Sequence, residues 1–270
     1  MEGDENALSG KYALVTGASS GMGLEYSRQL ACKGYSIIMV ALDDGDLKEA
    51  SEEVDSGCRV TPGQKIVPIG MDLGKYGSAD ELIARVGDLP VEILINNAGI
   101  FKFADMDEWP EPKVNMIMAV HMVTPVILCH HYSRLMKERG SGYILNVSSL
   151  AAWMPYPGMA MYSATKRFIK SFSRSLRIEL LHTGVTVTTA FFGAVDTGLY
   201  RLSDRLRKAA RRVSVMISAR EAASKALDAM FKGRSTVMPG FLNHLAIPIV
   251  STLSERNLNH LDRKYGKKFV

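Results

Sequence analysis

Short apolar runs alternate along this chain with longer segments in which apolar residues recur at helical spacing. The runs expected to form strands are Tyr12–Thr16, Tyr35–Leu42, Lys65–Gly70, Val91–Asn96, Tyr143–Val147, Val185–Phe192 and Ser235–Met238. The segments expected to form helices are Met22–Lys33, Asp44–Val54, Ala79–Val86, Pro112–Arg139, Met159–Leu181 and Arg220–Phe231. Strands that are apolar on both faces and joined by helices are typical of a parallel sheet covered by helices on both sides. We therefore predict an α/β fold with a doubly wound parallel sheet of about seven strands.

The composition is that of a soluble globular protein, with 47% hydrophobic and 23% charged residues. The formal net charge of +5 is local, because residues 201–212 contain six basic residues and one acidic residue, and this surplus equals the whole net charge. A nucleic-acid-binding protein is expected to carry a broader basic face. We therefore expect no nucleic-acid partner.

The three cysteines, Cys32, Cys58 and Cys129, have no paired spacing. We expect neither a disulfide framework nor a metal site, and a reducing compartment is the simplest location. The N-terminal segment is acidic and lacks the apolar core of a signal peptide. No run of about 18 uninterrupted apolar residues occurs, so we expect no transmembrane segment and a cytoplasmic protein.

The segment Thr16–Gly23, Thr-Gly-Ala-Ser-Ser-Gly-Met-Gly, lies between the first predicted strand and the first predicted helix. Glycines let the backbone approach a pyrophosphate, and the helix N-terminus presents free N–H groups to it. A tight strand–helix connection without a ligand is the alternative, but the strand–helix context favours phosphate binding.

An acidic residue about 20 positions after such a turn binds the ribose hydroxyls of NAD, whereas a nearby arginine suits NADP. Asp43 stands at that position, next to Leu42 and Asp44, and no Arg or Lys occurs between Lys33 and Lys48. We therefore expect NAD(H) or NADP(H), with a slight preference for NAD(H). The alternative is that Asp43 and Asp44 only cap the next helix.

A possible catalytic group follows the fifth predicted strand: Ser149, then Tyr162 thirteen residues later, then Lys166. Residues four apart on a helix lie on one face, so Lys166 can sit beside the Tyr162 hydroxyl and lower its pKa. A tyrosine with a lowered pKa is a useful general acid or base near neutral pH. Ser149 could donate a hydrogen bond to a substrate oxygen.

Together with Asn96–Gly99 and Phe192–Thr197, these motifs closely resemble the short-chain dehydrogenase/reductase family over about residues 10–240. The resemblance implies a Rossmann-type fold and an enzyme that transfers hydride between a nicotinamide cofactor and a carbonyl or alcohol. It also implies a homodimer or homotetramer.

Carried over residue by residue, the resemblance makes Tyr162 the proton donor or acceptor, Ser149 the residue that polarises the carbonyl, and Lys166 the ligand of the nicotinamide ribose. The residues that it assigns to the cofactor are Gly17, Ser19, Ser20, Gly21, Met22 and Gly23 at the pyrophosphate, Leu42, Asp43, Asp72 and Leu73 at the adenosine end, Asn97, Ala98 and Gly99 at the sheet and ribose, Tyr162 and Lys166 at the nicotinamide ribose, and Val195 and Thr197 at the carboxamide.

Two residues depart from the family pattern. His121 stands where the family usually has an asparagine that supports a proton relay to the lysine. We count it among the candidate catalytic residues, because it could keep the helix geometry and add a titrating group; a histidine packed between helices without a relay role is the alternative. Phe192 stands where the family usually has proline, which affects the geometry of the nicotinamide loop but not the fold.

We expect a single domain, 1–270, because no linker or repeat interrupts the chain. It has a core at 10–240, a substrate lid at 198–230 that the resemblance implies, and a C-terminal arm at 241–270, beyond the region that the resemblance covers. The arm begins with an apolar stretch and ends with cationic residues, as in an interfacial membrane segment. We favour an arm packed over the substrate site or a neighbouring subunit, because the apolar stretch lacks a clean helical moment.

We predict an oxidoreductase that interconverts a ketone and a secondary alcohol on a bulky apolar substrate, of hydroxysteroid or long-chain 3-oxoacyl type. Trp153, Pro155 and Tyr156 make the expected substrate wall apolar. The basic segment 201–212 falls in the expected lid, where it would attract an acidic group on the substrate or form only a solvated helix face. The alternative function is an NAD(P)-binding sensor or interaction protein that has lost catalysis.

Overall fold

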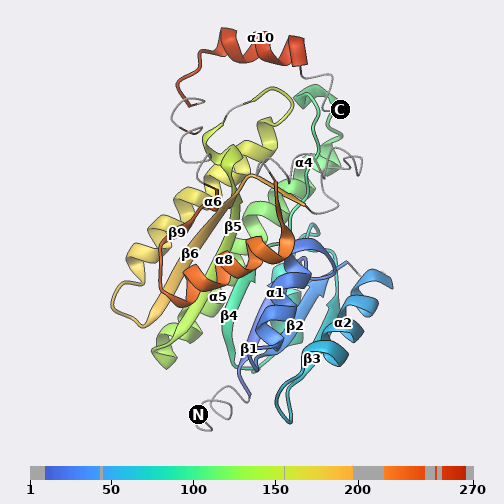
Figure 1. The fold of residues 1–270 in the computed structure, drawn as a ribbon, viewed down its shortest axis with the longest axis vertical. Coiled ribbons are helices and arrows are strands. Elements are labelled where there is room, and N and C mark those ends of the chain that lie inside the picture. The colour runs from blue at the N-terminus through green and yellow to red at the C-terminus, as the bar shows by residue number, and fades with distance from the viewer. Residues whose placement is uncertain are drawn as a thin grey trace.

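The computed structural model describes residues 10–42, 45–154, 156–196, 216–240, 247 and 251–265 (Figure 1). Its centre is a seven-stranded parallel sheet in the order β3-β2-β1-β4-β5-β6-β9. The strands are β1 Tyr12–Thr16, β2 Ser36–Ala41, β3 Ile66–Gly70, β4 Val91–Asn96, β5 Gly142–Ser149, β6 Val185–Phe192 and β9 Thr236–Val237. The predicted fold class and strands are confirmed. The chain reverses direction across the sheet between β1 and β4, which is where doubly wound folds bind ligands.

Helices cover both faces of the sheet because alternate strand residues point to opposite sides. Ala13 and Ile37 face one apolar cluster, which includes buried residues of α1, α2 and α8. Leu14 and Ile38 face the other, which is formed with α3, α5 and α6. The helices are α1 Gly21–Ala31, α2 Gly45–Cys58, α3 Ser78–Val86, α4 Glu111–Met118, α5 Thr124–Arg139, α6 Ala160–Glu179 and α8 Ala219–Phe231.

Three elements differ from the sequence prediction. The helix expected over Pro112–Arg139 consists of α4, a π-helical turn at Ala119–Val123 and α5. A second, two-stranded parallel sheet pairs β7 (Ala194–Asp196) with β8 (Met216–Ser218). The tail contains a helix, α10, at Glu255–Tyr265.

The expected substrate lid at 198–230 is only partly described. Residues 197–215, with the basic segment and Thr197, lie outside the described residues. From residue 219 onward the chain forms α8, whose Ala222, Ala226 and Leu227 are buried in the core beside α1. This part is therefore a structural helix of the fold and not a lid.

The helical stretch Glu111–Arg139 has 29 residues, and its most apolar window has a mean hydropathy of 1.4. By length and composition it could cross a bilayer, but the core helix of a soluble protein meets the same criterion. Within it, Leu128, Tyr132 and Met136 are buried against the sheet. That this chain has no transmembrane segment stays a prediction.

Candidate active site

The glycine-rich turn between β1 and α1 adopts a conformation that only glycine fits. Gly17 has φ +66°, and a Cβ atom there would lie 2.9 Å from the Cα of Ala98. At Gly23 a Cβ atom would lie 1.9 Å from the carbonyl oxygen of Gly17. The segment therefore packs backbone against backbone, and α1 begins within it, at Gly21. The side chain of the N-cap Ser20 makes no capping hydrogen bond, so the first N–H groups of α1 can bind an anion.

The turn is held against the end of β4 by Thr16 and Asn97. The backbone N–H groups of Asn97 and Ala98 both donate to Oγ1 of Thr16, at 3.0 Å each. The Asn97 amide donates in return to the carbonyl oxygens of Thr16 at 3.0 Å and Gly17 at 3.2 Å. Asn97 thus joins the two strands that flank the chain reversal, which agrees with the supporting role expected for it.

The structure brings Ser149, Tyr162 and Lys166 together at the ends of β5 and α6. The hydroxyl groups of Ser149 and Tyr162 are hydrogen-bonded to each other. Nζ of Lys166 donates to the carbonyl oxygen of Val147 at 3.1 Å and lies 5.7 Å from the centre of the Tyr162 ring. Oγ of Ser148 donates to the carbonyl oxygen of Lys166 at 2.9 Å, which fixes α6 against β5. The three predicted side chains therefore converge in one place.

The protonation of this group differs from the expectation. Burial raises the pKa of Tyr162, and the hydrogen bond from Ser149 only partly offsets this rise. Burial also lowers the pKa of Lys166 to about 8. The lowered tyrosine pKa expected from the Tyr–Lys spacing is therefore wrong for this arrangement, because desolvation dominates. Tyr162 carries its proton at neutral pH.

His121 lies in the π-helical turn with only 1% of its surface exposed. Its Nε2 accepts from the backbone N–H of Ile100 at 3.0 Å. Its Nδ1 is 2.9 Å from Oγ1 of Thr165, which itself donates to the carbonyl oxygen of Tyr162. Because Nε2 must accept and the Thr165 hydroxyl is already donating, Nδ1 carries the hydrogen atom.

The His121 ring is therefore neutral, with one tautomer selected by its partners. Burial, and then the nearby charge of Lys166, hold the pKa of His121 well below its usual value. The ring connects the loop after β4, at Ile100, to the helix that carries Tyr162. Of the two sequence alternatives, an added titrating group does not fit this environment at neutral pH, whereas the packed histidine does.

A cavity of about 80 Å³ joins these parts. The predicted residues that line it are Met22, Asn97, Gly99, Ser149, Tyr162, Lys166 and Val195. A second cleft, of about 430 Å³, contains Leu42 and Asp72 from the expected adenosine end. Leu73, the next residue after Asp72, is buried, and its carbonyl oxygen accepts from Thr124. Asp43 lies outside the described residues.

Sequence reasoning did not single out Ile100, Phe101 or Thr165. The edge of the Phe101 ring contacts Tyr162, with the ring centres 4.9 Å apart. Ile100 and Thr165 bind the two nitrogen atoms of His121. Their only sequence signal is adjacency, since Ile100 follows Gly99 and Thr165 precedes Lys166. Among the residues that the structure describes, no group of three or more metal-ligating side chains comes together.

Comparison with known proteins gives consistent results. The family model described as short chain dehydrogenase matches residues 11–207. The very-long-chain 3-oxoacyl-CoA reductase of Meyerozyma guilliermondii is 33% identical over 207 residues, which are 73% of this chain and 60% of that protein. The chain spans 54–62% of the length of the first three curated relatives that it matches.

Two solved structures have the same fold. One, from a study of 7beta-hydroxysteroid dehydrogenase stereoselectivity, has a TM-score of 0.83 at 22% identity and covers 97% of this chain and 99% of its own. The other, a short-chain dehydrogenase from Sphingobium yanoikuyae in complex with NADPH, has a TM-score of 0.75 at 22% identity and covers 91% of this chain and 97% of its own.

Proposed function

This chain belongs to the short-chain dehydrogenase/reductase family of oxidoreductases, and we propose that it reduces a ketone on a bulky apolar substrate to a secondary alcohol. The observation that carries the proposal is the hydrogen-bonded pair Ser149–Tyr162 beside the buried Lys166. The reductase activity in the name of the Meyerozyma relative supports the same reaction class.

The cofactor that we propose is NAD(P)(H), which supplies or accepts a hydride when it is bound. The support is the glycine-rich turn, because its backbone leaves no room for a Cβ atom at Gly17 or Gly23 and can approach a pyrophosphate closely. Asn97 holds that turn, and Lys166 faces the cavity in which the nicotinamide ribose would lie.

Between the two cofactors, Asp43 favours NAD(H), whereas the Sphingobium structure is a complex with NADPH. Titration of the protein with NADH and with NADPH, followed by fluorescence, decides between them. Tighter binding of NADPH would make the interpretation of Asp43 wrong.

The chain's own groups act on the carbonyl oxygen in the proposed reaction. Ser149 and Tyr162 donate hydrogen bonds to it, and Tyr162 supplies the proton that converts it to a hydroxyl group. A raised pKa suits this direction, because Tyr162 then carries the proton at neutral pH. Oxidation of an alcohol would instead require Tyr162 to lose its proton, which burial opposes.

Aromatic and aliphatic side chains support an apolar substrate. Phe101, Trp109, Met159 and Met161 pack against the small buried cluster that contains Tyr162. Phe103 and Tyr156 contact each other in the neighbouring loops. We propose hydroxysteroids or long-chain 3-oxoacyl thioesters as the substrate class, with an acidic group attracted by the basic segment 201–212. If the apparent substrate affinity does not depend on salt concentration, this would argue against an acidic group on the substrate.

The substitution Tyr162→Phe tests the reaction. It removes the proton donor and keeps the ring against Phe101, so turnover of a ketone panel should fall by roughly 100-fold or more, while NAD(P)H binding is retained. Unchanged turnover would reject the mechanism.

Cofactor binding without turnover of any ketone by the unaltered protein would favour the sensor alternative. A cytoplasmic homodimer or homotetramer stays a prediction, to be tested by localisation and light scattering.

A further inference from the structure

The C-terminal ends of α1 and α2 lie together although they are distant in the sequence. Cys32 caps the end of α1, and Cys58 is the last residue of α2, 26 positions later. The two helices contact each other on one face of the sheet. An ion pair between Arg28, one turn before Cys32, and Glu53 of α2 also joins them.

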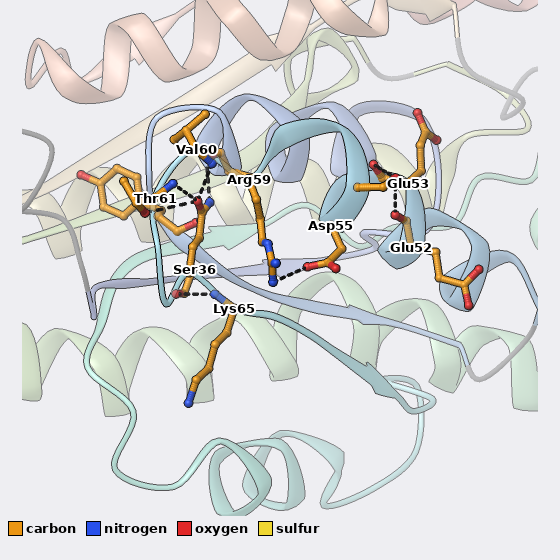
Figure 2. Close-up of polar contacts among 12 residues, drawn as sticks. Ser36, Glu52, Glu53, Asp55, Arg59, Val60, Thr61 and Lys65 are labelled. Carbon is orange, nitrogen blue, oxygen red and sulfur yellow. Dashed lines mark hydrogen bonds and ion pairs between the residues drawn. The ribbon is translucent and has the colours of Figure 1, made fainter.

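A single buried amide holds the two ends in place. Nε2 of Gln64 donates to the carbonyl oxygens of Ala31 and Tyr35, at 2.7 Å each. Its Oε1 accepts from the backbone N–H groups of Val60 at 3.0 Å and Thr61 at 3.3 Å. Figure 2 shows Val60 and Thr61 in the loop that follows α2. Ala31 directly precedes Cys32, and Val60 follows Cys58 by two residues. Gln64 therefore ties the chain next to Cys32 to the loop that follows Cys58.

The thiol groups themselves meet at this junction. The two thiol groups lie close enough to interact, since Cys32 raises the pKa of Cys58. Cys32 is exposed and Cys58 is half-buried, whereas Cys129 is completely buried in the core. We propose that Cys32 and Cys58 form a reversible intramolecular disulfide when the protein meets a low-molecular-weight disulfide such as oxidised glutathione.

The reaction proceeds by two exchanges. The exposed Cys32 thiolate attacks one sulfur of oxidised glutathione, which forms a mixed disulfide and releases one glutathione thiolate. The Cys58 thiol loses its proton and attacks the Cys32 sulfur, which forms the Cys32–Cys58 bond and releases the second glutathione. Two protein thiols are oxidised, and one glutathione disulfide is reduced to two thiols.

The second exchange becomes easier once the first has occurred. Burial raises the pKa of Cys58, and the nearby Cys32 raises it further, to about 11. When Cys32 carries glutathione, the contribution of its free thiol is lost, whereas Arg28 continues to lower the pKa of Cys58. The burial contribution remains, so ring closure should be faster at pH 8.5 than at pH 7.

The disulfide would fasten α1 to α2 at the end remote from the glycine-rich turn. Cys32 is eleven residues past the start of α1 at Gly21, which places it roughly 16 Å along the helix axis. We therefore expect NAD(P)H affinity to change less than about twofold, whereas the melting temperature rises by roughly 5 °C or more because the unfolded chain is constrained. The proposal does not depend on the proposed reaction.

The experiment equilibrates the full chain with mixtures of reduced and oxidised glutathione, followed by acid quenching, intact mass and peptide mapping. The expected product has lost two hydrogen atoms, contains a Cys32–Cys58 linkage and keeps Cys129 as a free thiol. Cys32→Ser and Cys58→Ser are matched variants, and neither should form the linkage or gain thermal stability. Dithiothreitol should reverse both changes in the unaltered protein.

Three results would overturn the proposal. They are a glutathione adduct on Cys32 that never closes to the disulfide, a disulfide between two copies of the chain, and retention of all three thiols at every ratio of oxidised to reduced glutathione. Each is separated from the expected product by mass and by migration on a non-reducing gel. Turnover is not among the readouts, so failure here leaves the proposed reaction untouched, and the reverse also holds.

Discussion

Replacing the buried Lys166 by methionine should stabilise the folded protein near neutral pH. Lys166 has 5% of its surface exposed, and no carboxylate among the described residues forms an ion pair with it. Its cation is therefore largely removed from water without a compensating charge, which costs stability. Methionine keeps the length of the side chain and removes the charge.

The magnitude follows from the pKa. An unfolded lysine has a pKa of about 10.4, and the pKa of Lys166 in the fold is about 8. This difference corresponds to roughly 3 kcal/mol of destabilisation at pH 7. Loss of the hydrogen bond from Nζ to the carbonyl oxygen of Val147 offsets about 1 kcal/mol. Lys166→Met should therefore gain about 2 kcal/mol at pH 7.

The gain should disappear at alkaline pH. Between pH 8 and about 10.4 the unfolded state binds more protons at this lysine than the folded state, so the stability of the unaltered protein rises with pH through this interval. At pH 10 the folded Lys166 is neutral, so the variant no longer gains stability from the removal of a buried charge. Only the cost of the missing hydrogen bond to Val147 remains. The two proteins should then have nearly the same free energy of unfolding, or the variant should be slightly less stable.

Urea unfolding at pH 7 and pH 10, both without cofactor, measures the two differences. Lys48→Met is the matched control, because its side chain is 81% exposed and the change should stay within about 0.5 kcal/mol at both pH values. A Lys166→Met protein that is less stable at pH 7, or whose difference is the same at both pH values, would refute the reasoning. Ketone reduction by this variant should fall by roughly 100-fold or more, since Lys166 lies beside Tyr162.

Three further changes test other parts of the site. His121→Ala should destabilise the protein by about 2–4 kcal/mol in urea unfolding, because it leaves a cavity and an unpaired N–H at Ile100. His121→Asn should recover part of this lost stability. A shift of the pH–rate profile between pH 6 and 8 in either variant would contradict a neutral histidine. Gly23→Ala places a methyl group 1.9 Å from a backbone oxygen, so NAD(P)H binding by fluorescence titration should weaken by roughly tenfold or more, and unchanged affinity would rule out the turn as the cofactor site. Phe101→Ala should raise kcat/KM for bulky ketones relative to small ones by roughly tenfold, and an unchanged ratio would exclude this ring from the substrate wall.

Most of the sheet could be predicted from the sequence because each strand carries its own signal. Five of the six residues of β2 and four of the six of β4 are apolar, and such runs are typical of strands buried between two helical layers. The glycine-rich turn is also recognisable, since Gly17 and Gly23 leave no room for a Cβ atom and the motif lies between a strand and a helix. Both signals depend on local conformation and periodicity, so they can be recognised from residues that are close together in the sequence.

The properties of the site were decided by segments that are distant in the sequence. The Tyr–Lys spacing correctly indicated that Tyr162 and Lys166 share a helix face, but not how deeply both are buried, and burial reverses the expected direction of the tyrosine pKa. His121 is neutral because Ile100 and Thr165 meet its two nitrogen atoms from different elements.

The same distinction applies to the cysteines and to the expected lid. Nothing in the spacing of Cys32 and Cys58 indicates that Gln64 brings the ends of two helices together. The part of the expected lid after residue 218 is a core helix because its alanines fit against α1. The sequence by itself determined the strands, the turn and the candidate reacting groups, since these depend on local pattern. Only the tertiary structure decided the protonation states and contacts of these groups, because desolvation and hydrogen-bond pairing depend on how segments distant in the sequence pack together.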